Sequence, residues 1–387
     1  MPILNRAAEM QQEIAQWRRH LHRNPELGFD VFETAAFVAG KLGEFGCDEV
    51  VTGLGKTGVV GIISGRRGAG ATIGLRADMD ALPITEATGK PYASAKPGKM
   101  HACGHDGHTA MLLGAAKYLA ETRNFAGTVA VIFQPAEEGG GGGHEMIKDG
   151  LMERFGIRKV FGMHNMPGLP VGHFAIRPGP IMAATAEFTL RIKGRGGHAA
   201  IPHATIDPIV IGSHLVSALQ SVVARSTDPV ESLVVSVTKF HAGDAYNVIP
   251  ETAELAGTVR TLKPEVAQIA EQRMRAICTG IAGSFGAEIE FDYDANYPVT
   301  FNHAEETVFA ADVAAAIAGE TNVHRDIQPL MGGEDFSYML QARPGAFIFL
   351  GNGDTAGLHH PAYDFNDDTA AYGVSYWVKL AETALAG

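Results

Sequence analysis

The pattern of hydrophobic residues changes twice along the chain, and this change constrains the fold more than any other feature. Between residues 187 and 293, segments that alternate apolar and polar residues are separated by two helical stretches, in the order β-α-β-β-α-β. The expected elements cover residues 187–193, 207–224, 233–240, 253–261, 264–285 and 288–293. This order is typical of a compact ferredoxin-like α+β domain, which we expect as an insertion at residues 183–295.

The sequence on either side of this insertion follows a different pattern. A helix expected from about Ala7 to Arg23 ends before Pro25. Short apolar runs then alternate with helical stretches, which predicts an α/β layer of parallel strands flanked by helices. The expected strands are 59–63, 72–75, 128–133 and 159–162, and the expected helices are 108–121 and 145–152. We therefore expect residues 1–182 and 296–387 to form one α/β domain with a mixed, mainly parallel sheet.

Charge and cysteine content exclude several classes of protein. The net charge is −12 and no basic patch is visible, so the chain is not expected to bind nucleic acid. The three cysteines are sparse and odd in number, which predicts reduced thiols in a cytoplasmic protein. The first residues lack a signal pattern, and no apolar run is expected to be long enough to span a membrane.

Two glycine-rich segments resemble phosphate-binding motifs. Gly53-Leu-Gly-Lys-Thr-Gly58 matches G-x-G-x-x-G, but a dinucleotide site needs a helix directly after the glycines. The strand-like run 59–63 follows instead, so a turn is expected here. The run Gly139 to Gly143 follows two glutamates whose charge would repel phosphate, so these glycines are expected to allow a close approach of backbone and ligand.

Polar side chains gather directly after the expected strands. They lie in the segments 76–80, 134–138, 163–165 and 358–361, while His101, Cys103, His105 and His108 precede a helix. Because ligands bind beyond the carboxyl ends of strands in open α/β sheets, we expect these clusters to converge. Thiolate, imidazole and carboxylate groups together suit Zn, Mn, Co or Ni. Each residue taken singly is compatible with packing, but their joint placement predicts a metal site.

The adjacent carboxylates Glu137 and Glu138 allow a division of labour at such a site. One carboxylate can coordinate a metal while the other takes a proton from the activated water. A solvated acidic turn is the alternative, and it is disfavoured because the pair directly follows a strongly apolar strand and a proline.

Taken together, these motifs resemble the M20 metallopeptidases, and specifically the branch of hippurate hydrolases, N-acyl-amino-acid amidohydrolases and auxin-conjugate hydrolases. The resemblance extends over nearly the whole chain. It rests on Arg19-His-Leu-His-Arg-Asn-Pro-Glu-Leu-Gly28, Arg76-Ala-Asp-Met-Asp-Ala-Leu-Pro83, Met100-His-Ala-Cys-Gly-His-Asp-Gly-His108, Gln134-Pro-Ala-Glu-Glu-Gly-Gly140, Gly196-Gly-His-Ala199, Asn247-Val-Ile-Pro250, Gly332-Gly-Glu-Asp-Phe336 and Leu358-His-His-Pro361.

The resemblance implies a role for individual residues. It implies a site for two divalent metal ions (Mn, Zn, Co or Ni), with a cysteine sulfur between them and with the ligands Cys103, His105, Glu138, His164 and His359. Spacing alone does not choose Cys103 and His105 over His101 or His108. Arg76 stands where the wider superfamily has a histidine ligand, so Asp78 is expected to act indirectly by orienting a ligand.

The resemblance also implies the catalytic groups and the partners. Glu137 matches the general base, and the inserted domain is expected to form a homodimer or higher homo-oligomer in which His198 reaches the partner's active site. Asn247 and Arg260 are candidates for binding the carboxylate of the substrate, a task that suits the fork of donors in arginine.

The expected activity is metal-dependent hydrolysis of the amide bond of small N-acyl amino acids similar to hippurate. A dipeptidase or aminopeptidase of the same superfamily is an alternative, and it differs in whether the substrate's amino group is free. A non-catalytic metal-binding protein is a third hypothesis, and the presence of Glu137 argues against it.

Overall fold

The computed structural model describes residues 3–387, which divide into two compact units. Unit 1 comprises the chain up to Ile181 together with Thr300–Gln328 and Asp335–Gly387. Unit 2 comprises Met182–Val299 and the short segment Pro329–Glu334.

Unit 1 contains an eight-stranded sheet with the strand order β1-β2-β4-β3-β5-β16-β6-β15. The strands are β1 (Glu49–Leu54), β2 (Gly58–Ser64), β3 (Thr72–Asp78), β4 (Thr128–Gln134), β5 (Ile157–Pro167), β6 (Phe174–Ala175), β15 (Val323–His324) and β16 (Gly345–Gly353). The central strands β4, β3, β5 and β16 are parallel, whereas β1, β2 and β6 join the sheet through antiparallel pairs. The predicted mixed, mainly parallel sheet is confirmed, but the strand expected at 59–63 is antiparallel to its neighbours.

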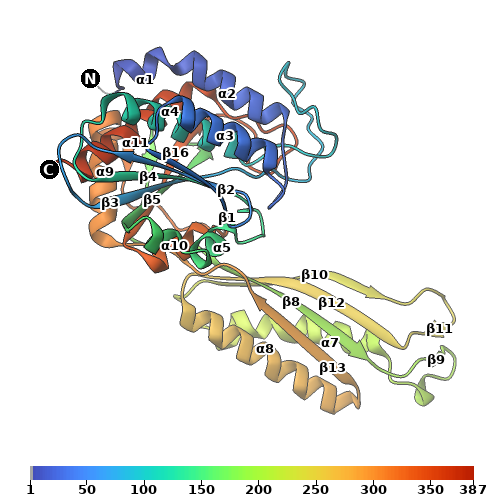
Figure 1. Cartoon of the computed structure of the whole chain (residues 1–387). Coiled ribbons are helices and arrows are strands. Elements are labelled where there is room, and N and C mark those ends of the chain that lie inside the picture. The colour runs from blue at the N-terminus through green and yellow to red at the C-terminus, as the bar shows by residue number, and fades with distance from the viewer. Residues whose placement is uncertain (1–2) are drawn as a thin grey trace. The chain divides into compact units, whose positions relative to one another are not determined.

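Helices cover both faces of this sheet, and Figure 1 shows α2, α3, α4 and α11 together on one side with α5 and α10 on the other. The helices of unit 1 are α1 (Asn5–Glu9), α2 (Gln11–Arg23), α3 (Phe32–Glu44), α4 (His105–Thr122), α5 (Gly142–Lys148), α6 (Leu151–Arg154), α9 (Ala304–Ala318), α10 (Phe336–Ala342) and α11 (Ala370–Ala384). Two expected helices are interrupted. The first breaks at Met10, and the stretch 145–152 breaks at Asp149 and Gly150.

Unit 2 has a four-stranded antiparallel sheet in the order β10-β12-β8-β13, and two long helices pack against it. The elements are β8 (Ala184–Lys193), α7 (Pro208–Ser221), β10 (Leu233–Ala242), β12 (Thr252–Thr261), α8 (Pro264–Phe285) and β13 (Glu288–Ala295). Asp207 caps α7 by accepting from the backbone N–H groups of Ile209 and Val210. The expected ferredoxin-like order of elements is confirmed.

The remaining elements are short. β7 (Gly179–Met182) pairs with β14 (Thr300–Asn302), and β9 (Gly197–His198) pairs with β11 (Val248–Ile249). The 3₁₀ helices are η1 (Pro202–Ala204), η3 (Glu320–Asn322) and η4 (Asp367–Thr369), and η2 (Val222–Ser226) is a π-helical turn.

The helix α7 and the turn that follows it form one long apolar segment. Pro208–Ser226 is long and apolar enough to cross a membrane by length and composition, so the expectation that no such segment exists was wrong. One such helix is weak support for a membrane span. Its buried residues Ile211, Leu215 and Leu219 belong to the core of unit 2, yet only 28% of the window is buried. Most of this window is therefore left uncovered within one chain, and the exposed residues of α7 include Ile209 and Val210 beside serine, histidine and glutamine side chains.

Candidate metal centre

A sharp turn between β3 and α4 places two candidate ligands side by side in unit 1. Gly104 has φ 90°, and a Cβ atom at this position would lie 2.2 Å from Asn165 Nδ2. Only glycine fits such a position. This turn brings the side chains of Cys103 and His105 close together. The side-chain amide of Asn165 holds the turn by donating to the backbone oxygen of Cys103 at 2.6 Å.

The later strand ends bring the other candidates to this turn. Cys103 and His105 form one group of potential ligands with His164, and Cys103 forms a second with Glu138 and His359. Within each group the potential ligand atoms lie within 4.8 Å of one another. The structure thus brings together all five residues that the sequence proposed as ligands, although they are distant in the sequence.

His164, at the end of β5, has its ring fixed by the backbone. Its Nδ1 donates to the Asn165 carbonyl oxygen at 2.6 Å, and its Nε2 lies 3.3 Å from Cys103 Sγ. Burial, with His108 nearby, lowers the pKa of His164 well below its usual value. This environment favours the neutral imidazole, and the hydrogen bond at Nδ1 leaves Nε2, on the side of the cysteine sulfur, as the nitrogen that could bind a metal.

His359 reaches the site from the loop after β16. Its backbone is in the left-handed region, with φ 62°, and its N–H donates to the Ala102 carbonyl oxygen at 2.7 Å. Its Nε2 lies 3.2 Å from Glu138 Oε1. Hydrogen bonds with Cys103 and Glu138 raise the pKa of His359 to about 10. The cysteine and the carboxylate therefore attract positive charge at this position.

Buried atoms without partners test whether a cation fits. Among the described residues, both ring nitrogens of His105 are buried without a hydrogen-bond partner, and the buried Oε1 of Glu138 faces the ring nitrogen of His359. His105 Nε2 lies 3.8 Å from Asp78 Oδ2 and 4.0 Å from both Glu137 Oε2 and Glu138 Oε1, which is too long for hydrogen bonds. Burial opposes a positive charge, but Asp78 and Cys103 raise the pKa of His105 well above its usual value. This set of sulfur, nitrogen and oxygen donors fits Zn, Mn, Co or Ni.

The structure separates the two other histidines from this set. His108 Nδ1 lies 2.6 Å from Asp78 Oδ1, and its Nε2 accepts the Asn165 backbone N–H at 2.9 Å. Since both of its nitrogens already have partners, His108 is not expected to bind a metal. Its ring packs against that of His164, with 4.4 Å between the ring centroids. His101 belongs to none of the ligand groups, and burial lowers its pKa to about 3.

Asp78 makes its hydrogen bonds to other groups than the expected ligands. Its carboxylate accepts from Arg76 Nη1 at 2.7 Å and pairs with His108, which leaves His105 beyond hydrogen-bond distance. Arg76 also bonds Gln134 and Asp335, at 2.9 and 3.0 Å. Arg76 and Asp78 therefore form a buried hydrogen-bonded group next to the candidate ligands. Asp78 contacts His108, whose ring packs against that of His164.

One residue of the site was missed by the sequence reasoning. The Asp80 carboxylate accepts the backbone N–H groups of Glu137 and Glu138, each at 3.0 Å, and lies 3.4 Å from His105 Nδ1. Its spacing of two residues from Asp78 was the available signal, because alternate residues of an extended segment point to the same side.

The three candidates in unit 2 are not all brought together within one copy of that unit. His198 lies on β9 opposite Val248, and the Ala199 N–H donates to the Asn247 carbonyl oxygen at 3.0 Å. Arg260 lies on β12 eight residues beyond its first residue, Thr252, which corresponds to roughly 26 Å of extended chain. Arg260 is half-buried, and burial lowers its pKa. His198 and Asn247 are therefore neighbours, whereas Arg260 lies toward the opposite end of the sheet.

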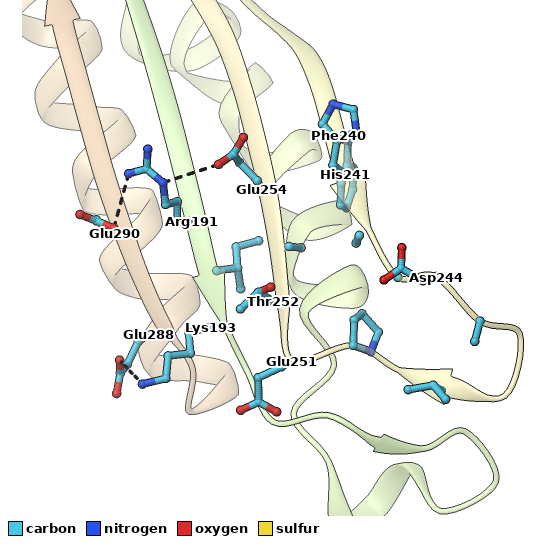
Figure 2. Close-up of a pocket in the computed structure, with 17 residues that line it drawn as sticks. Arg191, Lys193, Phe240, His241, Asp244, Glu251, Thr252, Glu254, Glu288 and Glu290 are labelled. Carbon is cyan, nitrogen blue, oxygen red and sulfur yellow. Dashed lines mark hydrogen bonds and ion pairs between the residues drawn. The ribbon is translucent and has the colours of Figure 1, made fainter.

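A pocket on the sheet of unit 2 has different chemistry. Figure 2 shows Arg191 between Glu254 and Glu290, at 3.5 Å from each, and Lys193 beside Glu288 at 3.4 Å. None of the residues proposed as ligands or as catalytic groups lines this pocket. Its charged groups are largely paired with one another, so the cluster in unit 1 is the better candidate for chemistry.

Comparisons with known proteins agree with this site. Residues 74–383 match peptidase family M20/M25/M40. The chain is 45% identical to the hippurate hydrolase of Campylobacter jejuni over 98% of this chain and 99% of that protein. It is 42% identical to an N-acetylcysteine deacetylase of Bacillus subtilis over 96% of this chain and 97% of that protein.

A solved structure from Bacillus subtilis, described as a dinuclear metal-binding peptidase of the M20 family, is also similar. It has a TM-score of 0.84 and 36% identity, and the match covers 98% of this chain and 99% of that one. The chain therefore belongs to peptidase family M20/M25/M40, and it is an amidohydrolase of the type of hippurate hydrolase and the N-acyl amino acid deacetylases.

Proposed function

We propose that this amidohydrolase cleaves the amide bond of N-acyl amino acids at a site for two divalent ions, with Glu137 as the general base. The observation that carries the proposal is the convergence of five donor residues, with both buried ring nitrogens of His105 lacking a hydrogen-bond partner and with Glu137 Oε2 4.0 Å from His105 Nε2. In this proposal residues 1–182 and 296–387 form the catalytic domain, and 183–295 form the dimerisation domain.

The proposed metal ligands are Cys103, His105, Glu138, His164 and His359. Cys103 belongs to both donor groups, which supports a position of its sulfur between two ions. When bound, two divalent ions supply positive charge that activates water and stabilises negative charge on the carbonyl oxygen. The donor set admits Mn, Zn, Co or Ni.

Glu137 is placed to move a proton. It is buried beside the ligand Glu138, and its carboxylate faces the cluster. In the proposed reaction the Glu137 carboxylate accepts a proton from the attacking water. It then transfers this proton to the nitrogen of the leaving amino acid, so that one residue serves as base and then as acid.

The proposed substrate class is supported by two relatives, a hippurate hydrolase and an N-acetylcysteine deacetylase. Both names describe removal of an acyl group from an amino acid, which favours acylated substrates over the free amino group of a dipeptide. The test is release of free amino acid from a panel of N-benzoyl and N-acetyl amino acids and matched dipeptides, with and without chelator. Cleavage of dipeptides alone would favour the peptidase alternative, and no cleavage by the metal-loaded protein would favour a non-catalytic role.

The proposed partner is a second copy of the chain, bound through unit 2. The exposed positions of α7 carry no acidic side chain, lysine or arginine, and they are Ile209, Val210, Ser213, His214, Ser217, Gln220 and Ser221. The neighbouring β10 is an edge strand of its sheet. A helix face with little charge beside an unpaired strand edge suits an interface between subunits. A dimer would allow His198 and Asn247 from one subunit to act at the other subunit's site.

We also propose a cytoplasmic location. The three cysteines are free, and Cys103 must be a reduced thiol to serve as a ligand. Both features suit a reducing compartment.

A further inference from the structure

Two histidines lie together at one edge of the sheet of unit 1. His173 directly precedes β6, and His324 is the last residue of β15. β15 is the outermost strand of the sheet and runs parallel to β6, with His324 opposite Ala175. Because alternate residues of a strand point to the same side, His173 and His324 emerge on one face. Neither histidine belongs to the ligand groups of the candidate metal centre.

The two imidazole rings are close to each other. Nδ1 of His173 lies 3.3 Å from Nε2 of His324, and the ring planes are inclined by 21° with 5.5 Å between the centroids. This separation is longer than the range of about 2.7–3.2 Å that is usual for bonds from N–H donors. Two nitrogen ligands on one tetrahedral zinc ion, with bonds of about 2.0–2.1 Å, are about 3.3 Å apart. The spacing of the two nitrogens is therefore that of two ligands on one ion.

The surroundings of this pair leave room for a cation. His324 is exposed and His173 is partly exposed, so a hydrated ion can reach both nitrogens and keep water at its other coordination positions. The charged neighbour Arg325 is already paired, with Asp312 at 2.8 Å and with Glu320 at 2.7 Å. The positive charge of Arg325 is thus balanced by two carboxylates and does not oppose a second cation beside His324.

The strand that carries His324 is short. β15 has two residues, and it joins the sheet through the pairs Val323–Phe174 and His324–Ala175. An ion held by both His173 and His324 would add a link between this edge strand and β6.

We propose that His173 and His324 together bind one further divalent ion, at a site separate from the candidate metal centre. Two imidazoles favour Zn²⁺, Ni²⁺ or Cu²⁺ over Mn²⁺ and Mg²⁺, which prefer oxygen ligands. This inference goes beyond the proposed function, because it depends neither on the five ligands proposed there nor on any substrate.

The test counts Zn²⁺ ions per chain by equilibrium dialysis over a series of free Zn²⁺ concentrations, followed by elemental analysis. The variants are His173→Gln, His324→Gln and the double variant, since glutamine is polar and of similar length but has no imidazole nitrogen. His20→Gln is the matched control, because His20 is an exposed histidine that stacks on Phe37 instead of on another histidine, with 4.7 Å between the centroids.

Each single variant is expected to bind one Zn²⁺ ion fewer than the wild type. The double variant should lose no more than either single variant, because one ion needs both ligands. His20→Gln should match the wild type, and with Mn²⁺ every variant should match it. Equal zinc counts in the wild type and the single variants overturn the inference. A loss of two ions in the double variant also overturns it, since the histidines would then bind two separate ions.

A second measurement uses the wild type alone, so it decides the question even if a variant does not fold. Diethyl pyrocarbonate modifies accessible imidazole nitrogens, and mass spectrometry follows the modification of each histidine. Saturating Zn²⁺ should slow the modification of His173 and His324 several-fold relative to Mn²⁺, because the ion occupies the nitrogen lone pairs. His20 should react equally with either ion present. Equal rates at His173 and His324 with the two ions would overturn the inference.

The outcome for this pair is separate from the outcome for the proposed function. If the protein binds no ion at the five proposed ligands or cleaves no N-acyl amino acid, the proposed function fails. The difference in zinc count between the wild type and the single variants still decides whether His173 and His324 bind an ion.

Discussion

His164 Nε2 lies 3.3 Å from Cys103 Sγ, while the other nitrogen of the same ring donates to a backbone carbonyl oxygen. These two atoms come from residues 61 positions apart in the sequence. The distance is close to that between two ligands on one tetrahedral ion with metal–ligand bonds of about 2.0–2.3 Å. This distance supports the proposal that Cys103 and His164 bind the same ion, and the first prediction concerns the Cys103 sulfur.

Replacing Cys103 by serine is expected to lower zinc affinity by at least about 10-fold, because a hydroxyl is a poor substitute for a soft thiolate. The number of ions per chain, measured by elemental analysis after dialysis, should fall below that of the wild type. Cys47→Ser is the control, since Cys47 is partly buried outside the ligand groups. Unchanged metal content in Cys103→Ser would contradict the proposal that the Cys103 sulfur is a ligand.

Replacing Glu137 by glutamine is expected to lower kcat by about 10²- to 10⁴-fold, because the amide cannot accept a proton. Bound metal should remain at the wild-type level, since the proposed ligand is Glu138. Glu138→Gln should show the opposite pattern, with metal lost first. Equal loss of metal in both variants would contradict the division of labour between the two glutamates.

His22 on α2 predicts a dependence of stability on pH. Burial lowers its pKa, but the Asp106 carboxylate, 2.9 Å from Nδ1, outweighs burial and raises the pKa of His22 to about 9. The folded value exceeds the unfolded value of about 6.5. The stabilisation from this pair is therefore fully present below pH 6.5 and is lost as the pH rises through 9.

For the metal-free protein we expect urea unfolding to show about 3 kcal/mol less stability from this pair at pH 9.5 than at pH 6.5. His22→Gln should be less stable at pH 6.5 and should lack this dependence. His20→Gln, on the exposed side of the same helix, should behave as the wild type. A His22→Gln variant with the wild-type pH dependence would show that other groups cause it.

Mixing two inactive variants tests the role of His198 in the partner's site. In a mixed dimer of Glu137→Ala and His198→Ala, one site has both groups intact. Under subunit exchange at equal amounts, roughly a quarter of wild-type activity should return, because half the dimers are mixed and each has one good site of two. Glu137→Ala mixed with Glu138→Ala is the control and should stay inactive. No recovery after confirmed exchange would exclude the role in trans.

Much of the site was predictable because parallel strands share an edge. Asp78 ends β3, Glu138 follows β4 and His164 lies near the end of β5, so their positions at one edge of the sheet predict that they lie close together. The choice between His105 and His108 was not predictable from spacing, because residues three apart share one face of a helix. It depends on Asp78 and Asn165, which engage both nitrogens of His108.

Other features depend on backbone contacts, whose partners the sequence does not identify. Asp80 acts through the backbone N–H groups of a turn, and any residue type except proline supplies such groups. In the same way, the order of elements in unit 2 follows from hydrophobic periodicity, but the exposure of α7 does not. The apolar composition of Pro208–Ser226 indicates a buried helix, whereas only 28% of this window is buried in the structure.

The most direct test of the account is activity measured as metal is returned to the chelated protein. N-benzoylglycine or the best N-acyl substrate is supplied, and release of free amino acid is followed against equivalents of Mn²⁺ or Zn²⁺ per chain. We predict no activity without metal and an increase that levels off at about two equivalents. Full activity in the chelated protein, or two bound ions with no cleavage of any N-acyl amino acid, would contradict the account.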